Sequence, residues 1–270
     1  MRCAVLGDPI AHSLSPALHN AGYAEVGLDW LYDAHLVGSG GLRAFLGGLD
    51  ESWRGLSLTM PLKREAVSLA DRVADTAREA GAANTLVLVD GEVHADNTDV
   101  PGAAAALRER YDGPVESVTI LGGGATAAST ALAMAGLGAR EVRLLVRSPE
   151  RAAHTVALVE AHHDRPTVLV GSLADAPVTG DVVVSTVPAA AQDDVLLERC
   201  AQVPVVFEAV YDPWPTPLAA SALDRVLVSG LDLLVHQAAL QFRLFTGLPA
   251  PLAAMRDAGE AALAARQVGT

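Results

Sequence analysis

The segment SLTMPLKREAV contains Lys63, the only lysine among 270 residues, while the other 18 basic side chains are arginines. One interpretation is compositional drift, in which arginine replaced lysine throughout and one lysine survived by accident. The other is chemical. An ammonium group is compact and can titrate when its surroundings demand it, whereas a guanidinium group stays charged. Beside a carboxylate, such a lysine can stabilise a developing alkoxide and deliver a proton to it.

Further polar residues suited to a small hydroxylated or anionic ligand occur elsewhere in the chain. Ser13 and Ser15 lie in GDPIAHSLSP, Asn84 lies in GAANTL, and Asp99 lies in ADNTDVPG. Each has an ordinary structural explanation. Ser15 is predicted as a helix N-cap, Asn84 as a turn residue and Asp99 as another cap. N-capping by Ser15 leaves Ser13 unexplained, and none of these residues alone indicates a function.

A glycine turn, GGGATA, follows the predicted strand at residues 118–121 and precedes a helical pattern and a second strand, EVRLLV. Strand, G-x-G-x-x-A turn and helix together are typical of dinucleotide binding, because the helix N-terminus offers free N–H groups to a pyrophosphate. An ordinary strand–helix turn is the alternative. The predicted cofactor contacts are Gly122, Gly123, Gly124, Ala125, Thr126 and Ala127.

The end of the second strand indicates which cofactor is bound. NAD sites usually place an acid there for the ribose hydroxyls. Here the sequence is VRSPER, with Arg147, Ser148 and Arg151, and no acid precedes Glu150. Guanidinium groups and a hydroxyl suit a 2′-phosphate. The sequence therefore predicts NADP as the cofactor and disfavours a methyltransferase.

The composition excludes several classes of protein. The net charge of −13 disfavours nucleic acid and anionic membranes as partners, and no apolar run of 18 residues occurs. Two cysteines offer neither a disulfide framework nor a metal-type spacing, and Cys3 lies in a strand pattern typical of a buried thiol. We expect a cytoplasmic location. A homodimer is possible, and the sequence leaves the oligomeric state open.

Apolar strand patterns alternate with helical patterns along the chain, which predicts an α/β fold with parallel sheets covered by helices. The dipeptide Asp90–Gly91 predicts a hairpin turn. A fresh strand–helix–strand unit begins near residue 115. We therefore predict a first domain at residues 1–100, completed by the helical tail 232–270, and a second domain at residues 101–231.

Six motifs occur in a characteristic order: GDPIAHSLSP, LTMPLK, GAANT, DNTD, GGGATA and GLDLLVHQA. In this order and spacing the chain resembles the shikimate dehydrogenase family from end to end, and most of all the forms from high-GC Gram-positive bacteria. The resemblance implies an N-terminal α/β substrate domain, a Rossmann-type dinucleotide-binding domain and a cleft between them. It also implies NADP-dependent interconversion of 3-dehydroshikimate and shikimate.

The resemblance assigns roles to individual residues. Lys63 and Asp99 match the catalytic pair. Ser13 and Ser15 match residues that hold the substrate carboxylate. The remaining matches are Thr59, Asn84, Tyr211 and Gln237 at the substrate, with Thr186 and Gly230 at the cofactor.

The sequence also departs from the family pattern. Ser57 stands where the family motif N-V-T-x-P-x-K has asparagine, Ala125 replaces a turn glycine, and Val100 follows Asp99 where the family has glycine. A quinate/shikimate dehydrogenase and a non-catalytic NADP-binding regulatory paralogue remain as alternatives. We expect no metal site, and the AHHD segment is interpreted as a solvated helix end.

Overall fold

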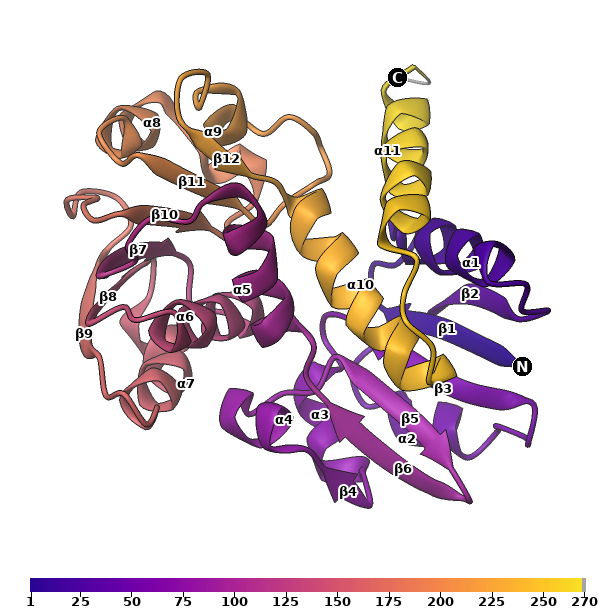
Figure 1. Ribbon diagram of the computed structural model, residues 1–270. Helices are drawn as coiled ribbons and strands as arrows, with labels where there is room; N and C mark the ends of the chain where they lie inside the picture. The colour runs from indigo at the N-terminus through magenta and orange to yellow at the C-terminus, as the bar shows by residue number, and fades with distance from the viewer. Residues whose placement is uncertain (269–270) are drawn as a thin grey trace. The chain divides into compact units, whose positions relative to one another are not determined.

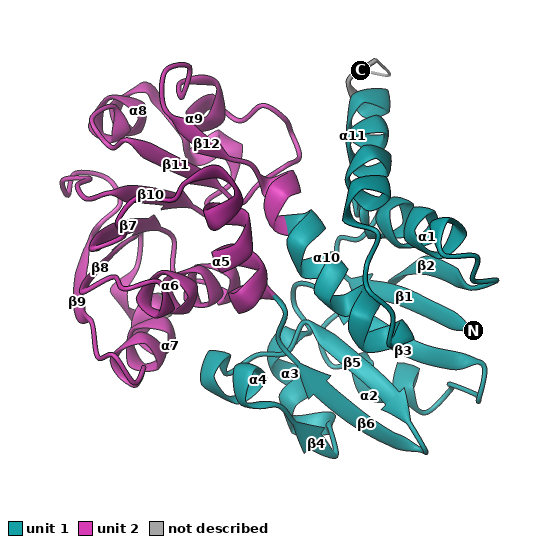
Figure 2. Cartoon of the chain, in the orientation of Figure 1, with its two compact units in different colours: residues 1–98, 234–270 teal, residues 99–233 magenta. Residues whose placement is uncertain are grey.

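The structure is a computed structural model that describes residues 1–268, except for the side chains of Arg151, Gln267 and Val268. The chain forms two compact units (Figure 2). Unit 1 contains residues 1–98 and the segment from Leu234 onward, and unit 2 contains residues 99–233. Unit 1 is therefore built from both ends of the chain.

Unit 1 is organised around a six-stranded mixed sheet with strand order β2-β1-β3-β5-β6-β4 (Figure 1). Its strands are β1 (Arg2–Gly7), β2 (Leu31–Leu36), β3 (Trp53–Leu58), β4 (Arg72–Val73), β5 (Thr85–Val89) and β6 (Glu92–Asp96). Its helices are α1 (Ser15–Glu25), α2 (Leu42–Leu46), α3 (Lys63–Leu69), α4 (Asp75–Ala80), most of α10 (Gly230–Thr246) and α11 (Leu252–Val268). β1 pairs in parallel with β2 and β3, whereas β5 is antiparallel to β3 and β6.

The hairpin between β5 and β6 confirms the predicted turn. Asp90 and Gly91 both have positive φ, 51° and 82°. Two consecutive residues with positive φ are what a two-residue type I′ turn requires, because its twist matches that of the strands. The turn brings Asp96, at the end of β6, opposite Thr85, at the start of β5.

The two faces of the unit 1 sheet carry different side chains. On one face Leu6, Leu56 and Leu86 are fully buried in the cluster that includes α2, α3 and α4 residues. The opposite face meets α10 at Gly55, where a Cβ atom would lie 2.2 Å from the Phe245 ring. Because side chains alternate along a strand, Ser57 shares this face with Gly55.

His19 of α1 is fully buried and stacks on Tyr32, with ring centroids 4.2 Å apart. Burial lowers the pKa of His19 to about 3. The imidazole must therefore stay neutral in the folded chain, whereas it protonates near pH 6.5 once unfolded. Such a group stabilises the fold above its unfolded pKa, and this contribution is lost as the pH falls toward 3.

We expect the free energy of unfolding to fall less steeply in acid for His19→Phe, which keeps an aromatic ring, than for the parent. The parent should lose up to about 1.4 kcal/mol of unfolding free energy per pH unit through this one group below pH ~6.5. Urea unfolding at several pH values measures the slope. The matched control is His163→Gln, since His163 is exposed. Equal slopes for the parent and His19→Phe would contradict the assignment.

Unit 2 contains a six-stranded sheet in which every pairing is parallel, with order β12-β11-β10-β7-β8-β9. Its strands are β7 (Ser117–Leu121), β8 (Glu141–Val146), β9 (Thr167–Ser172), β10 (Val182–Ser185), β11 (Val205–Glu208) and β12 (Val226–Val228). Its helices are α5 (Asp99–Arg110), α6 (Ala125–Gly136), α7 (Pro149–Glu160), α8 (Asp194–Cys200), α9 (Pro217–Ala220), the 3₁₀ turn Ala189–Ala191 and the first residues of α10.

The strand order of unit 2 is the doubly wound order of dinucleotide-binding folds. Both faces of its sheet are buried, since Val182 and Val184 face a core cluster with α5 and α6, while Val183 faces another with α8. Full burial on both faces is why the strands read as continuous apolar runs. The α/β prediction is confirmed.

The expectations for the two cysteines and for membrane-spanning segments can also be compared with the structure. Cys3 and Cys200 are free and buried, and burial raises the pKa of each thiol to about 11. The buried thiol predicted at Cys3 is therefore confirmed. Within the described residues, no helix is both long enough and apolar enough to cross a membrane.

Candidate functional site

The predicted substrate residues of unit 1 gather at one edge of its sheet. β1 and β3 are parallel, so the segments that follow Gly7 and Leu58 emerge together. Asp8 N donates to Met60 O at 2.9 Å, and Thr59 N donates to Leu6 O at 2.9 Å. A Cβ atom on Gly7 would lie 2.3 Å from Thr59 Cγ2, so only glycine allows this approach. The serine segment and the lysine loop therefore lie side by side.

Ser15 does not take the N-cap position predicted for it. Helix α1 begins at Ser15, its N-cap is Leu14, and no side chain caps it. Instead, Ser15 N donates to Ser13 Oγ at 3.3 Å. The capping prediction for Ser15 is therefore wrong, because Ser13 supplies the local acceptor. The hydroxyl of Ser15 is not needed to satisfy the helix end.

The lysine loop is anchored through its backbone. Lys63 is the first residue of α3, and its carbonyl accepts from Ala83 N at 2.7 Å. Leu62 N donates to Thr59 O at 2.9 Å, which closes a turn just before the helix. The Met60–Pro61 peptide within this turn is cis. Lys63 is partly exposed, and the residue after Ala83 is Asn84.

Asn84 is at the centre of a buried polar cluster in unit 1. Its Nδ2 donates to Thr98 Oγ1 at 2.9 Å and to Gln237 Oε1 at 3.3 Å, and its Oδ1 accepts from Thr98 N at 2.8 Å. Gln237 comes from α10, so residues 153 positions apart meet here. Thr98 directly precedes Asp99, the first residue of α5. Asp99 is buried, with 8 % exposure.

Sequence reasoning missed the layer beneath this cluster. Tyr32, Ser57, Thr85 and Gln241 are buried polar residues hydrogen-bonded to one another below Asn84. A signal was present for Gln241. It lies four residues after Gln237 on the same helix, and such residues share a helix face.

The glycine turn of unit 2 has the geometry of a dinucleotide-binding loop. Gly122 has φ +118°, and a Cβ atom there would lie 2.3 Å from Thr186 Oγ1. Gly123 packs against Ala152 of α7, with 3.0 Å from an added Cβ to the Ala152 Cβ. A Cβ on Gly124 would meet nothing within 4 Å, so the backbone there is open to a ligand. Ala127 is fully buried in the core.

Helix α6 begins at Ala125, directly after Gly124. Its first turn, which includes Thr126, carries N–H groups that have no acceptor within the helix, because i→i−4 bonding cannot reach them. Open space above Gly124 and these donors fit a pyrophosphate. The residues present at this turn therefore suit a dinucleotide cofactor.

The predicted 2′-phosphate residues follow β8. Arg147 is exposed, and Ser148 is the N-cap of α7 without a side-chain cap bond. The Ser148 hydroxyl instead donates to Glu150 Oε2 at 2.6 Å, and this bond lowers the pKa of Glu150. An ionised carboxylate therefore competes for the hydroxyl that the sequence assigned to a phosphate. Arg151 belongs to α7, and its side chain lies outside the described residues.

Two other predicted residues of unit 2 lie near the end of β11. A Cβ on Gly230 would lie 2.7 Å from Ala209 O, so glycine is required at the start of α10. Tyr211 follows a buried anchor formed by Glu208, which accepts from Val210 N at 3.0 Å and from Thr216 Oγ1 at 2.8 Å. Burial raises the pKa of Glu208, although these donors oppose the shift.

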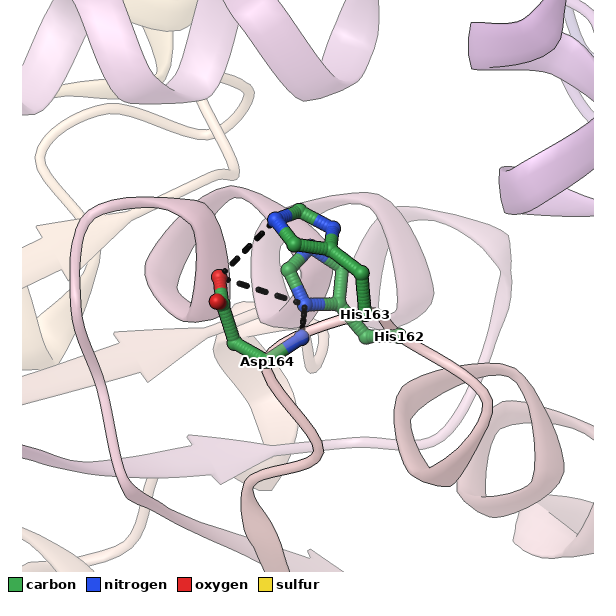
Figure 3. A group of neighbouring side chains, drawn as sticks. All are labelled: His162, His163 and Asp164. Atoms are coloured by element: carbon green, nitrogen blue, oxygen red, sulfur yellow. Dashed lines mark hydrogen bonds and ion pairs between the residues drawn. The ribbon is translucent and has the colours of Figure 1, made fainter.

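The AHHD segment brings three potential metal ligands together (Figure 3). Their ligand atoms lie within 4.8 Å of one another, and His163 Nε2 lies 3.1 Å from Asp164 Oδ2. However, His162 is buried, and its Nδ1 accepts from Asp164 N at 3.3 Å. The interpretation as a fully solvated helix end is therefore wrong for His162. The absence of a metal site stays a prediction.

Comparison with protein-family models gives three matches. Residues 5–86 match the shikimate dehydrogenase substrate-binding domain, and residues 230–258 match the shikimate 5′-dehydrogenase C-terminal domain. Residues 117–206 match a family described as NADP oxidoreductase, coenzyme F420-dependent. The first two matches lie mainly in unit 1, and the third lies in unit 2.

Individual proteins agree with these matches. The shikimate dehydrogenase (NADP(+)) of Methanothermobacter thermautotrophicus is 35 % identical over 94 % of both chains. The solved shikimate dehydrogenase of Mycobacterium tuberculosis is 40 % identical over 98 % of both chains, with a TM-score of 0.85. A Thermus thermophilus shikimate 5-dehydrogenase, solved with NADP(H) and shikimate, is 29 % identical over 97 % of this chain and 99 % of that one, with a TM-score of 0.82. From its motifs, its two sheets and these relatives, the chain belongs to the shikimate dehydrogenase family.

Proposed function

We propose that the protein catalyses the reversible, NADP-dependent reduction of 3-dehydroshikimate to shikimate. The observation that carries the proposal is the polar edge of the unit 1 sheet, where Asn84 and Gln237 lie beside the backbone of the lysine loop. Family membership supports the same activity.

In this proposal the substrate carboxylate is held by the hydroxyls of Ser13 and Ser15. The ring hydroxyls contact Thr59, Asn84 and Gln237, and Tyr211 contributes near the carboxylate. The freedom of the Ser15 hydroxyl from helix capping supports the first assignment. Amide and hydroxyl groups can both donate and accept, which suits a polyhydroxylated ring.

Lys63 and Asp99 carry the proton chemistry in this proposal. Reduction of the ring ketone adds a hydride to carbon and a proton to oxygen, and oxidation removes both. Lys63 places a positive charge at the reacting oxygen and transfers the proton, while the carboxylate of Asp99 keeps the ammonium oriented. NADPH, when bound, supplies the hydride.

The cofactor would be held by residues of unit 2. Gly122 to Ala127 would hold the pyrophosphate, and Arg147, Ser148 and Arg151 would bind the 2′-phosphate. Thr186 and Gly230 would line the rest of the cofactor-binding surface. The open backbone at Gly124 supports this placement.

Steady-state kinetics with shikimate and quinate, each with NADP⁺ and NAD⁺, test the proposal. We expect the highest kcat/KM for shikimate with NADP⁺. A preference for quinate or NAD⁺ would favour the quinate/shikimate branch of the family. Binding of NADPH without any turnover would instead identify a non-catalytic paralogue.

Replacing Ser13 and Ser15 together with alanine should raise KM for shikimate strongly, because both hydroxyls would contact the carboxylate before and during the reaction. The single variants separate local structure from binding. Ser13→Ala also removes the acceptor of Ser15 N and should cost about 1 kcal/mol of stability. Ser15→Ala should leave stability nearly unchanged. Unchanged KM in the double variant would contradict the assignment.

We also propose a cytoplasmic location, which two free buried cysteines support. A homodimer is part of the same proposal, and light scattering on the purified protein tests it.

A further inference from the structure

A chain of buried hydrogen bonds runs beneath the proposed substrate site of unit 1. Tyr32 OH donates to Ser57 Oγ at 2.5 Å, and Ser57 Oγ donates to Gln241 Oε1 at 2.8 Å. Gln241 Nε2 donates to Thr85 Oγ1 at 3.0 Å, and Thr85 Oγ1 donates to Asn84 Oδ1 at 2.9 Å. These five residues, called here the buried relay, are each at most 4 % exposed.

The direction of the buried relay is fixed by one backbone atom. Gln241 Nε2 also donates to the carbonyl oxygen of Asn84 at 3.1 Å, and a carbonyl can only accept. The amide oxygen of Gln241 must therefore face Ser57, which has to donate its single proton to it. Tyr32 is then the donor to Ser57. Every donor points toward Asn84, and such chains polarise one another.

The orientation of the Asn84 amide is fixed by Thr98 N, which donates to Asn84 Oδ1 at 2.8 Å, and the relay adds a second donor to the same oxygen. Thr85 accepts from Gln241, so its own proton is directed to Asn84 Oδ1. The amide NH₂ of Asn84 is left to face Gln237 Oε1 and Thr98 Oγ1. Both donors hold Asn84 Oδ1 in place, so a ring hydroxyl bound at Asn84 would accept from its NH₂ group in exchange for Gln237 Oε1.

The relay crosses two neighbouring strands of the unit 1 sheet. Ser57 and Thr85 are register partners across β3 and β5, on the sheet face that α10 covers. The serine that departs from the family motif is thus held between a tyrosine and a glutamine of its own unit.

We propose that Ser57 and Gln241 are positioning residues for the reaction, acting through the placement of Asn84, whose backbone oxygen accepts from Gln241 and whose Oδ1 accepts from Thr85. The proposal rests on the function proposed above. Neither residue needs to contact the substrate. Their effect is to select substrates with a hydroxyl that can accept from Asn84. Serine can replace the family's asparagine at position 57 because Gln241 Oε1 accepts a hydrogen bond from the Ser57 hydroxyl.

The test compares the parent with Ser57→Ala and Gln241→Glu, using shikimate and analogues that each lack one non-reacting ring hydroxyl. Loss of the relay should lower kcat/KM for shikimate about tenfold, the scale of one hydrogen bond. For the analogue that lacks the hydroxyl bound by Asn84, kcat/KM should change little. Discrimination between the two should fall about tenfold. KM for NADP⁺ should stay within about twofold.

Gln241→Glu supplies a second readout. A glutamate keeps the shape, but only its protonated form can donate to the Asn84 carbonyl. Its activity relative to the parent should therefore rise as the pH falls. Thr246→Val is the matched control, because Thr246 lies on the same helix and donates outside the relay, to Phe242 O.

The outcomes separate the two proposals. No oxidation of shikimate by the parent would refute the proposed function. A parent that turns over, with variants that lose stability but keep the parent's discrimination, would overturn the relay. If circular dichroism shows that Ser57→Ala does not fold, the pH dependence of the activity of Gln241→Glu is the deciding measurement. A pH dependence parallel to that of the parent contradicts the proposal.

Discussion

Lys63→Arg should lower kcat by at least about a hundredfold, although it keeps the positive charge. A guanidinium group is larger, planar and does not titrate near neutral pH, so it can neither occupy the same place beside one oxygen nor release a proton to it. A hundredfold loss is the usual scale for removing a positioned acid or base. Stopped-flow and steady-state kinetics with shikimate measure the loss.

Lys63→Met is the companion variant and should be at least as damaging, because it removes the charge as well. The affinity for NADPH should change little in both variants, since the predicted cofactor contacts lie in unit 2. Circular dichroism checks that α3, which begins at Lys63, still forms. If Lys63→Arg turns over within a fewfold of the parent, the lone lysine is a product of compositional drift.

Arg147→Ala should weaken NADPH binding about tenfold to a hundredfold and leave NADH nearly unchanged. The expected loss corresponds to one charge-assisted hydrogen bond, about 1.5–3 kcal/mol, and NADH has no 2′-phosphate to make it. Fluorescence titration with both nucleotides gives the two affinities. Equal weakening of both would remove the reason to assign a phosphate to this position.

Glu150→Ala is the matched variant, with the opposite expectation. In the structure Glu150 accepts a hydrogen bond from the Ser148 hydroxyl and places a negative charge beside the proposed phosphate position. Removing it frees the hydroxyl and relieves repulsion between like charges. The preference for NADPH over NADH should therefore increase. A decrease would indicate that Glu150 holds Ser148 in its binding position.

The regular parts of the fold were predictable because their signals are local. The Asp90–Gly91 turn depends on two adjacent residues that tolerate positive φ. The unit 2 strands are buried on both faces and are therefore apolar without interruption. The role of Gly122 also follows from its neighbours in the chain.

Other features could not be predicted from the sequence, and the relay is one of them because it depends on contacts between residues distant in the chain. The relay needs β3, β5 and α10 to meet, and Ser57 and Gln241 are 184 positions apart. The bond between Ser148 and Glu150 is local, but two competing acceptors for one hydroxyl cannot be ranked from residue types. Likewise, His162 at a polar helix end gives no sign of burial until the fold covers it.

The composition of unit 1 from both ends of the chain has a consequence during synthesis. Helix α11 packs on α1, and Gln241 completes the hydrogen bonding of Asn84. A ribosome-bound chain that ends at residue 233 already holds all of unit 2 but lacks α11 and most of α10. Until α10 and α11 have been translated, the α10-facing side of the unit 1 sheet therefore has no helix to cover it. Residues 1–98 thus reach their native environment only after the helices that complete their unit have been made.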